Sequence, residues 1–459
     1  MILVRSLLQR LNGNKQLIWL CCALLFSCGT ARKKTSVPRP PNQEPVQKEI
    51  PGKTLPNKID TIYWKEDIVK HESKPETNKV DSLPKDDKNK VSKAMKPIHI
   101  LALIPFKVSE QDTIVNKINA TNLRFVQFYA GMKMALNEFQ NKSEVPVFLD
   151  VFDSGEIEHT EKLLQERVKN TPDLIIGPYK TESLKFAANW AKQNKTMLVS
   201  PWISSSTITD QNQYYLQLKP GLNAHFQKIN EHARKHFNAD NIFLVSKSKV
   251  DSRAKYFNEG FTGKDLIQEE IISEEDLSKS IEPILEKYLK ADGPTVFILP
   301  MASSKDENYI YQFLRRVSAE KKTKPVYIYG LSKWTELKTD IFDFINTLNV
   351  RLSISNFTDE SRTDIKNFRR KYFDEYREFP GDDALEGYDV AQYLIGALLK
   401  SELPFQIENL KQQFKPLETE FEIKPMYKTN NTSQDVPDFY ENSFIRIVEI
   451  KNNRYNVIE

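Results

Sequence analysis

From residue 97 onward, short apolar runs alternate with longer segments of helical spacing. The runs are IHILALIPF, VPVFLDVFD, DLIIGP and TMLVSP. Apolar side chains recur with helical spacing between them, at 125–139, 160–168 and 183–191. Strands that are buried on both faces read as continuous apolar runs. The pattern therefore predicts an α/β fold in which helices cover both faces of a parallel sheet.

The same alternation returns in the second half of the chain. NIFLVSK, LIQEEII, TVFILP and VYIYG read as strands, and 281–289 and 309–317 read as helices between them. We expect two sheets of about five strands each, joined near residues 214–221, because each half is long enough to bury its own core.

The last hundred residues add elements to these two halves. NVRLSISNF follows the second half, and we expect a charged helix near 359–377 and an apolar helix at 384–400. The tail FIRIVEIKNNRYNVIE reads as a hairpin that turns at Asn452 and Asn453.

The first 28 residues have the layout of a secretory signal. Three basic residues precede an apolar core at 17–26, and all three cysteines of the chain lie in this segment. Leu25 to Cys28 resembles the lipobox of bacterial lipoproteins, which implies cleavage before Cys28 and lipidation of its sulfur. The alternative is an uncleaved membrane anchor. Cleavage would leave no other thiol for a disulfide, a zinc site or a nucleophile.

Residues 29–96 are rich in Pro, Lys, Asn and Asp and poor in apolar residues, so we expect a disordered tether. One island, IDTIYWKED at 59–67, can dock on a partner or on the folded part, or occur there by chance. The tether carries 16 Lys and Arg against 10 Asp and Glu, whereas residues 97–459 carry 47 against 52. The basic character belongs to the tether, so it gives no argument for nucleic-acid binding by the folded part.

Several motifs from residue 97 onward occur in a recognisable order. GMKMALNEF at 131–139 is followed by an IGP turn at 176–178, an SP turn at 200–201 and a GYDV helix segment at 387–390. This order resembles the type I periplasmic-binding-protein fold, and most closely the leucine-binding-protein-like receptors of branched-chain amino-acid ABC transporters. The resemblance implies a two-lobed Venus-flytrap architecture over roughly residues 97–459. The expected division is signal 1–28, tether 29–96, N-terminal lobe 97–220 plus about 356–410, and C-terminal lobe about 221–355 plus about 411–459.

The resemblance also implies where a ligand would bind in the first lobe. Thr181, Trp202 through its backbone, and Ser204 match positions that hold the carboxylate and ammonium of an amino acid. Ser183 near the start of the same helix and Ser205 in the same hydroxyl row extend the candidate set, because ligands of open α/β sheets lie beyond the strand ends. A helix cap and a polar loop would explain these residues equally well.

The second lobe departs from the family pattern. Ser303 lies in the segment that replaces the family's tyrosine, and Ser332 lies in the segment that replaces its acid. Asp251 and Arg253 lie in a different turn, which contains a tyrosine in the family. We expect these four residues to offer replacement polar contacts, or else to be solvated. A buried ammonium without the acid would lack its counter-charge, so the ligand can differ from an amino acid.

Enzyme motifs and cofactor sites are not expected. The sequence has no G-x-S-x-G, P-loop or H-E-x-x-H motif. His232 and His236 have helical spacing but no evident third ligand, so we expect no metal there.

We therefore expect a lipid-anchored, non-enzymatic protein of the bacterial envelope that faces the periplasm. It would close on a small polar, amino-acid-like ligand for an ABC permease or a sensor. The alternative is an interaction module without a small ligand. Such a module would be similar to the lipoproteins that regulate peptidoglycan synthesis, with a cell-wall synthase as its partner.

Overall fold

The computed structural model describes nine ranges of the chain. They are 60–62, 96–107, 120–167, 170–279, 282–337, 341–400, 415–428, 436–452 and 454–459. The expected signal with Cys28 lies outside them, and so does the tether apart from residues 60–62 and Lys96. Every helix in the described ranges is too short or too polar to span a lipid bilayer.

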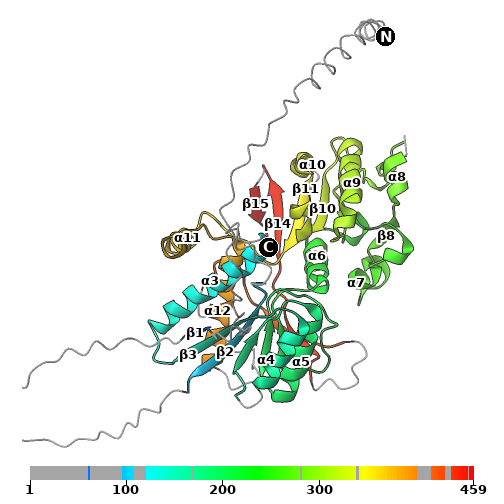
Figure 1. Ribbon diagram of the computed structural model, residues 1–459. Coiled ribbons are helices and arrows are strands. Elements are labelled where there is room, and N and C mark those ends of the chain that lie inside the picture. Colours follow the sequence, from blue (N-terminus) through cyan, green and yellow to red (C-terminus); the bar gives the residue numbers. More distant parts are fainter. Residues whose placement is uncertain are drawn as a thin grey trace, which may run out of the picture. The chain divides into compact units, whose positions relative to one another are not determined.

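The first sheet has the strand order β1-β3-β2-β4-β5-β6-β13-β12 (Figure 1). Its bounds are β1 (Asp60–Ile62), β2 (Ile98–Ile104), β3 (Val147–Asp153), β4 (Leu174–Ile176), β5 (Met197–Ser200), β6 (Tyr215–Gln217), β12 (Ile423–Met426) and β13 (Phe439–Asn442). β2 to β6 and β13 pair in parallel, whereas β1 on β3 and β12 on β13 are antiparallel. A strand from the 59–67 island thus joins the sheet edge.

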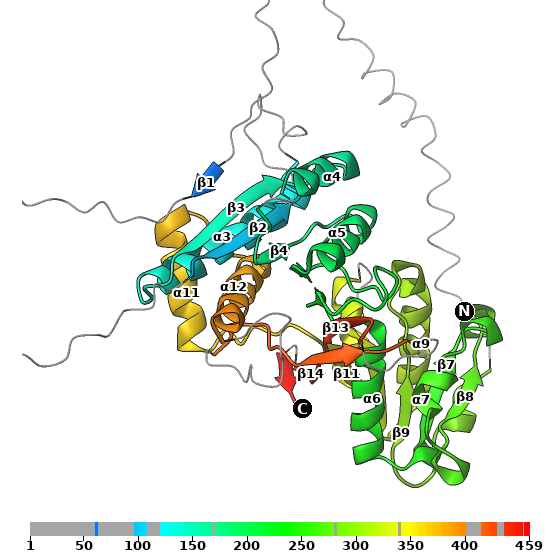
Figure 2. The same cartoon turned by 90° about the horizontal axis from the view of Figure 1, so that it is seen from below.

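Alternate side chains of β2 point to opposite faces of this sheet, and each face has its own core. Ile100, Ala102 and Ile104 pack with α3 (Ala120–Gln140) and α12 (Asp382–Lys400). Leu101 and Leu103 pack instead with α4 (Ile157–Glu166) and α5 (Thr181–Asn194). Figure 2 shows α3 running beside α12, and a further helix, α11 (Thr363–Tyr376), covers α3 and α12 from outside.

The second sheet has the order β15-β14-β11-β10-β9-β7-β8. Its bounds are β7 (Ile242–Ser246), β8 (Gln268–Ile271), β9 (Thr295–Ile298), β10 (Val326–Leu331), β11 (Asn349–Ile354), β14 (Arg446–Lys451) and β15 (Arg454–Val457). β7 to β11 pair in parallel, and β14 and β15 are antiparallel additions.

Helices cover both faces of the second sheet as well. α6 (Leu222–His236) and α7 (Ala254–Asn258) pack on one face. α8 (Glu274–Lys279), α9 (Glu307–Glu320) and α10 (Phe342–Thr347) pack on the other. The prediction of two helix-covered, largely parallel sheets is confirmed, and so is the terminal hairpin.

Two expectations about local structure differ from what is observed. The helix expected at 281–289 is, in its described part, only a short 3-10 turn at Glu286–Tyr288. The backbone N–H of Leu285 donates to the Glu320 carboxylate on α9 at 2.7 Å and not to a carbonyl one helical turn earlier. We also expected residues from about 411 onward in the C-terminal lobe. β12 and β13 instead extend the first sheet, because β13 pairs with β6 and Phe439 packs against Tyr215.

The chain passes between the two sheets three times. The crossings follow β6, β11 and β13, where the chain leads into α6, α11 and β14 respectively. The second crossing and the segment before β12 meet in a bridge between Asn356 and Thr419. Polar residues carried by these crossings therefore come close to one another.

Candidate ligand-binding site

A cavity of about 480 Å³ lies at the crossings between the sheets. Its size falls within the range of small-molecule sites, which is about 300 to 1,000 Å³. Lys219 lines it from the first crossing, residues 354–358 from the second, and Ser332 from the end of β10. The other lining residues used below are Arg124, Trp202, Asp382, Glu386, Glu418 and Thr419.

Two carboxyl groups enter this cavity from different segments. Glu386 projects from α12, and Glu418 lies on the segment before β12 with only 5% of its surface exposed. The Glu418 segment is held by Asp389 of α12, whose carboxylate accepts backbone N–H bonds from Leu417, Glu418 and Thr419 at 2.8, 2.8 and 2.9 Å. α12 thus supplies one acid and fixes the position of the other.

Burial raises the pKa values of these acids. Loss of water contact and the nearby Asp383 raise the pKa of Glu386 to about 7, although Lys219 and Arg124 oppose the shift. Burial, with Asp382 and Glu386 close by, raises the pKa of Glu418 well above its usual value. A positive charge in the cavity would reverse both shifts by stabilising the ionised forms.

Several buried polar atoms around the cavity lack a protein partner. Trp202 Nε1, Glu418 Oε2, Thr419 Oγ1 and Thr358 Oγ1 accept or donate no hydrogen bond within the described part of the chain. Trp202 is 5% exposed and Thr419 is 4% exposed. An unmade bond of this kind costs about 1–3 kcal/mol, so these atoms favour a ligand or ordered water in the cavity.

The residues predicted for the first lobe divide into two groups. Trp202 lines the cavity, where its ring packs edge-on against Phe125 and Phe128. Thr181, Ser183, Ser204 and Ser205 are not among the residues that line the cavity. Thr181 is the exposed first residue of α5, and Ser183 lies on the buried face of the first turn of the same helix.

The hydroxyl row after β5 forms local contacts instead. Ser204 is exposed. Ser205 shares a 2.9 Å hydroxyl contact with Thr207, and its backbone N–H donates to Gln217. A ligand role for these hydroxyls stays a prediction, and the local bonds fit the polar-loop alternative.

Of the residues predicted for the second lobe, Ser332 alone lines the cavity. Ser303 caps a short helical turn, because its hydroxyl accepts from the backbone of Lys305. Asp251 and Arg253 bond within their own turn, where the Arg253 guanidinium donates to the Asp251 carbonyl at 3.0 Å.

Sequence reasoning missed the two acids. Glu386 directly precedes the GYDV segment and, with Asp389, is one of two acids among the apolar residues in the middle of α12, which is a signal that could have been used. Glu418 gives no local signal, since its burial depends on the long-range bonds to Asp389.

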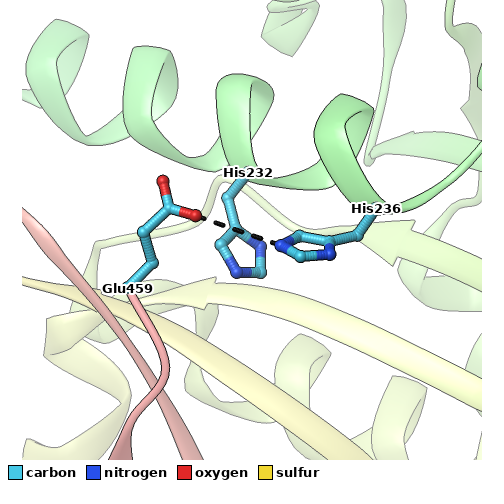
Figure 3. Close-up of side chains that lie close together, drawn as sticks. All are labelled: His232, His236 and Glu459. Atoms are coloured by element: carbon cyan, nitrogen blue, oxygen red, sulfur yellow. Dashed lines mark ion pairs between the residues drawn. The ribbon is translucent and has the colours of Figure 1, made fainter.

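A second cluster of possible metal ligands lies on α6, away from this cavity. His232 and His236 project from successive turns towards the carboxylate of Glu459, as Figure 3 shows. That carboxylate already accepts from Lys228 at 3.0 Å and from Lys235 at 2.8 Å. His232 donates to or accepts from the Tyr329 hydroxyl at 2.7 Å. Glu459 is the only acid of this cluster, and the positive charges of its two lysine partners would repel a divalent cation. We therefore assign no metal to this cluster.

Comparison with solved structures places the fold. A crystal structure of a candidate branched-chain amino acid ABC transporter from Rhodospirillum rubrum matches with a TM-score of 0.54 and 14% identity, over 79% of this chain and 100% of that one. An ABC transporter substrate-binding protein from Desulfitobacterium hafniense in complex with Leu matches with a TM-score of 0.47 and 15% identity, over 79% and 100%. A branched-chain amino acid substrate-binding protein from Streptococcus pneumoniae in complex with isoleucine has a TM-score of 0.41 and 14% identity, over 79% and 99%.

Sequence comparison gives one family and no individual relative. No curated protein matches the sequence. The family model described as "Receptor family ligand binding region" matches residues 127–415, which is more than half of the chain. The chain therefore belongs to the receptor-family ligand-binding regions and has the two-lobed type I periplasmic-binding-protein fold.

Proposed function

We propose that this protein is a lipid-anchored solute-binding protein of the bacterial cell envelope. It binds a small polar ligand in the cavity at the crossings and presents it to an ABC permease or a sensor, without catalysing a reaction. The observation that carries this proposal is the cavity of about 480 Å³ with buried polar atoms that have no hydrogen-bond partner among the described residues. The family match and the ABC-transporter description of the Rhodospirillum rubrum neighbour support it.

The site differs from the one that the family resemblance implied. Trp202 and Ser332 remain in it, and Glu386, Glu418 and Thr419 replace Thr181 and Ser204 as the principal polar contacts. Closure about the three crossings would bring both lobes onto the ligand, because residues of both sheets line the cavity.

Binding is tested by thermal unfolding of the full-length chain in the presence of candidate ligands. The panel contains amino acids, short peptides, amines, nucleosides, sugars and cell-wall fragments. A ligand at 100 times its Kd adds about 2.7 kcal/mol to the free energy of unfolding, so at least one compound is expected to raise the melting temperature.

Two sets of variants locate the site. Thr419→Val is expected to leave the unliganded protein as stable as before or more stable, because it removes a buried hydroxyl without a partner, and to reduce the ligand response. Thr181→Ala and Ser204→Ala are expected to keep the full response. The opposite pattern would return the site to the residues of the family resemblance.

The second candidate function is the interaction module. It is favoured by the position of the predicted hydroxyls of Thr181 and Ser204 outside the cavity lining. A flat response across the whole panel would overturn the solute-binding proposal and support this one, with a protein such as a cell-wall synthase as partner.

The lipid anchor is tested separately. Cells that express the full-length chain are labelled with a palmitate analogue, and the wild-type protein is expected to incorporate the label while Cys28→Ser does not, because the lipobox resemblance assigns acylation to this sulfur. Equal labelling of the two proteins would contradict the anchor.

A further inference from the structure

We propose that the cavity selects ligands with an ammonium or guanidinium group, which pairs with Glu418 and Glu386. This inference rests on the proposed function, since it assigns a ligand class to the same cavity. It does not use the hydroxyls or the second-lobe acid that the family resemblance implied.

The first argument is the charge left unpaired at the cavity. Among the charged lining residues, Glu336 pairs with Lys333 at 2.7 Å, Glu360 pairs with Arg369, and Arg124 pairs with Asp383 at 3.4 Å. No ion pair within the described ranges engages the other charged lining groups. These are Asp382, Glu386, Glu418 and Lys219.

Three carboxyl groups and one lysine thus remain without an ion pair among the described residues, and Asp382 is the one acid of the three that is exposed to solvent. A buried carboxyl in this position either stays protonated or takes up a cation. A ligand cation is the partner that satisfies Glu386 and Glu418 together.

The second argument is independent of the acids. The Trp202 and Thr419 side chains line the cavity, are more than nine-tenths buried, and each has a polar atom without a partner in the described structure. A ligand that offers hydrogen-bonding groups would satisfy these atoms when the lobes close on it.

The size and lining of the cavity favour an organic cation over a metal ion. About 480 Å³ far exceeds the space of one ion, and Trp202, Phe357 and Tyr455 contribute aromatic rings to the wall. Aromatic faces attract ammonium and guanidinium groups. Lys219 can also meet a carboxylate, so the ligand is either a pure amine or an amino acid with a cationic group.

The test uses matched compounds on the full-length protein. Cadaverine, 1,5-pentanediol and glutarate have five carbons each, and lysine is cadaverine with an added carboxylate. Agmatine and arginine form a second amine and amino-acid pair, and Ca²⁺ is the metal control. We expect at least one amine or guanidinium compound to bind at least tenfold more tightly than the diol and glutarate. Comparison of cadaverine with lysine, and of agmatine with arginine, separates a pure amine from an amino acid.

Glu418→Gln is expected to weaken binding of that compound by at least tenfold. The matched control is Glu422→Gln on the same segment, since Glu422 pairs with Lys424 and does not line the cavity, and it should change affinity less than twofold. Glu386→Gln provides a second variant if Glu418→Gln fails to fold.

The affinity should also depend on pH. Glu386 faces Lys219, Arg124, Asp383, Asp389 and Glu418, and its pKa is about 7. Amine binding by the wild type is therefore expected to strengthen about tenfold from pH 6 to pH 8, as the carboxyl ionises. Glu386→Gln should flatten this dependence, which a purely structural role of Glu386 would not do.

The outcomes separate the two proposals. If a neutral or anionic compound binds and Glu418→Gln leaves its affinity unchanged, the cation inference is wrong and the solute-binding proposal stands. Stabilisation by Ca²⁺ alone would likewise overturn it in favour of a metal. If no compound of either panel binds, both proposals are wrong.

Discussion

Gly387→Ala is expected to lower the free energy of unfolding by about 3 kcal/mol, at the upper end of the usual cost of overpacking. A Cβ at this position would lie 2.0 Å from the carbonyl oxygen of Phe128 on α3. The clash is with backbone, so α3 and α12 must separate. Urea unfolding monitored by tryptophan fluorescence measures the loss.

The same helix contains a matched control. A Cβ at Gly396 would meet no atom within 4 Å. Gly396→Ala should therefore raise stability by about 0.5–1 kcal/mol, the ordinary gain from replacing a helical glycine. Equal effects of the two substitutions would show that close approach of α3 and α12 is not what selects glycine at 387.

Asp389→Ala is expected to cost on the order of 3 kcal/mol or more, because it leaves three backbone N–H groups without their acceptor. These are the bonds to Leu417, Glu418 and Thr419, and Asp389 itself is fully buried. Asp389 is a positioning residue for Glu418, so ligand affinity should fall together with stability. Urea unfolding and titration with the best-binding compound measure the two effects.

Glu286→Ala is the control for Asp389→Ala. Glu286 pairs with Lys322 at 2.9 Å, but its side chain is 47% exposed. An exposed ion pair contributes little to stability, so this variant should lose far less than Asp389→Ala. It should also keep full ligand affinity, because Glu286 does not line the cavity. A loss comparable to that of Asp389→Ala would contradict the special role of the buried carboxylate.

The fold could be predicted because its signals are local. Continuous apolar runs such as 98–104 became strands buried on both faces, and the tail became the expected hairpin. The helix expected at 281–289 depended on apolar spacing alone, which does not record the bond of the Leu285 N–H to Glu320, 35 residues later. The sheet that β12 and β13 join is set by pairing with β6, more than 200 residues earlier, which no local pattern records.

The candidate site was harder to predict because it is assembled at chain crossings. Trp202 was predicted through the family resemblance and Ser332 as a departure from it, and both line the cavity. Glu418 enters the cavity through a loop that Asp389 anchors, so its role depends on a contact between distant segments. Thr181 and Ser204 have hydroxyl groups suited to a polar ligand and follow strands, but they do not line the cavity. Residue type and sequence position alone therefore did not identify the lining.

Amide hydrogen exchange is the most direct test of the claim that this cavity is the solute site. The full-length chain is compared with and without the panel compound that raises its melting temperature most. The account predicts that the compound slows exchange in all of these segments together: 417–419, 386–390 of α12, 332–336 and 354–358. Protection confined to one lobe, or centred on 181–183 and 204–207, would contradict it.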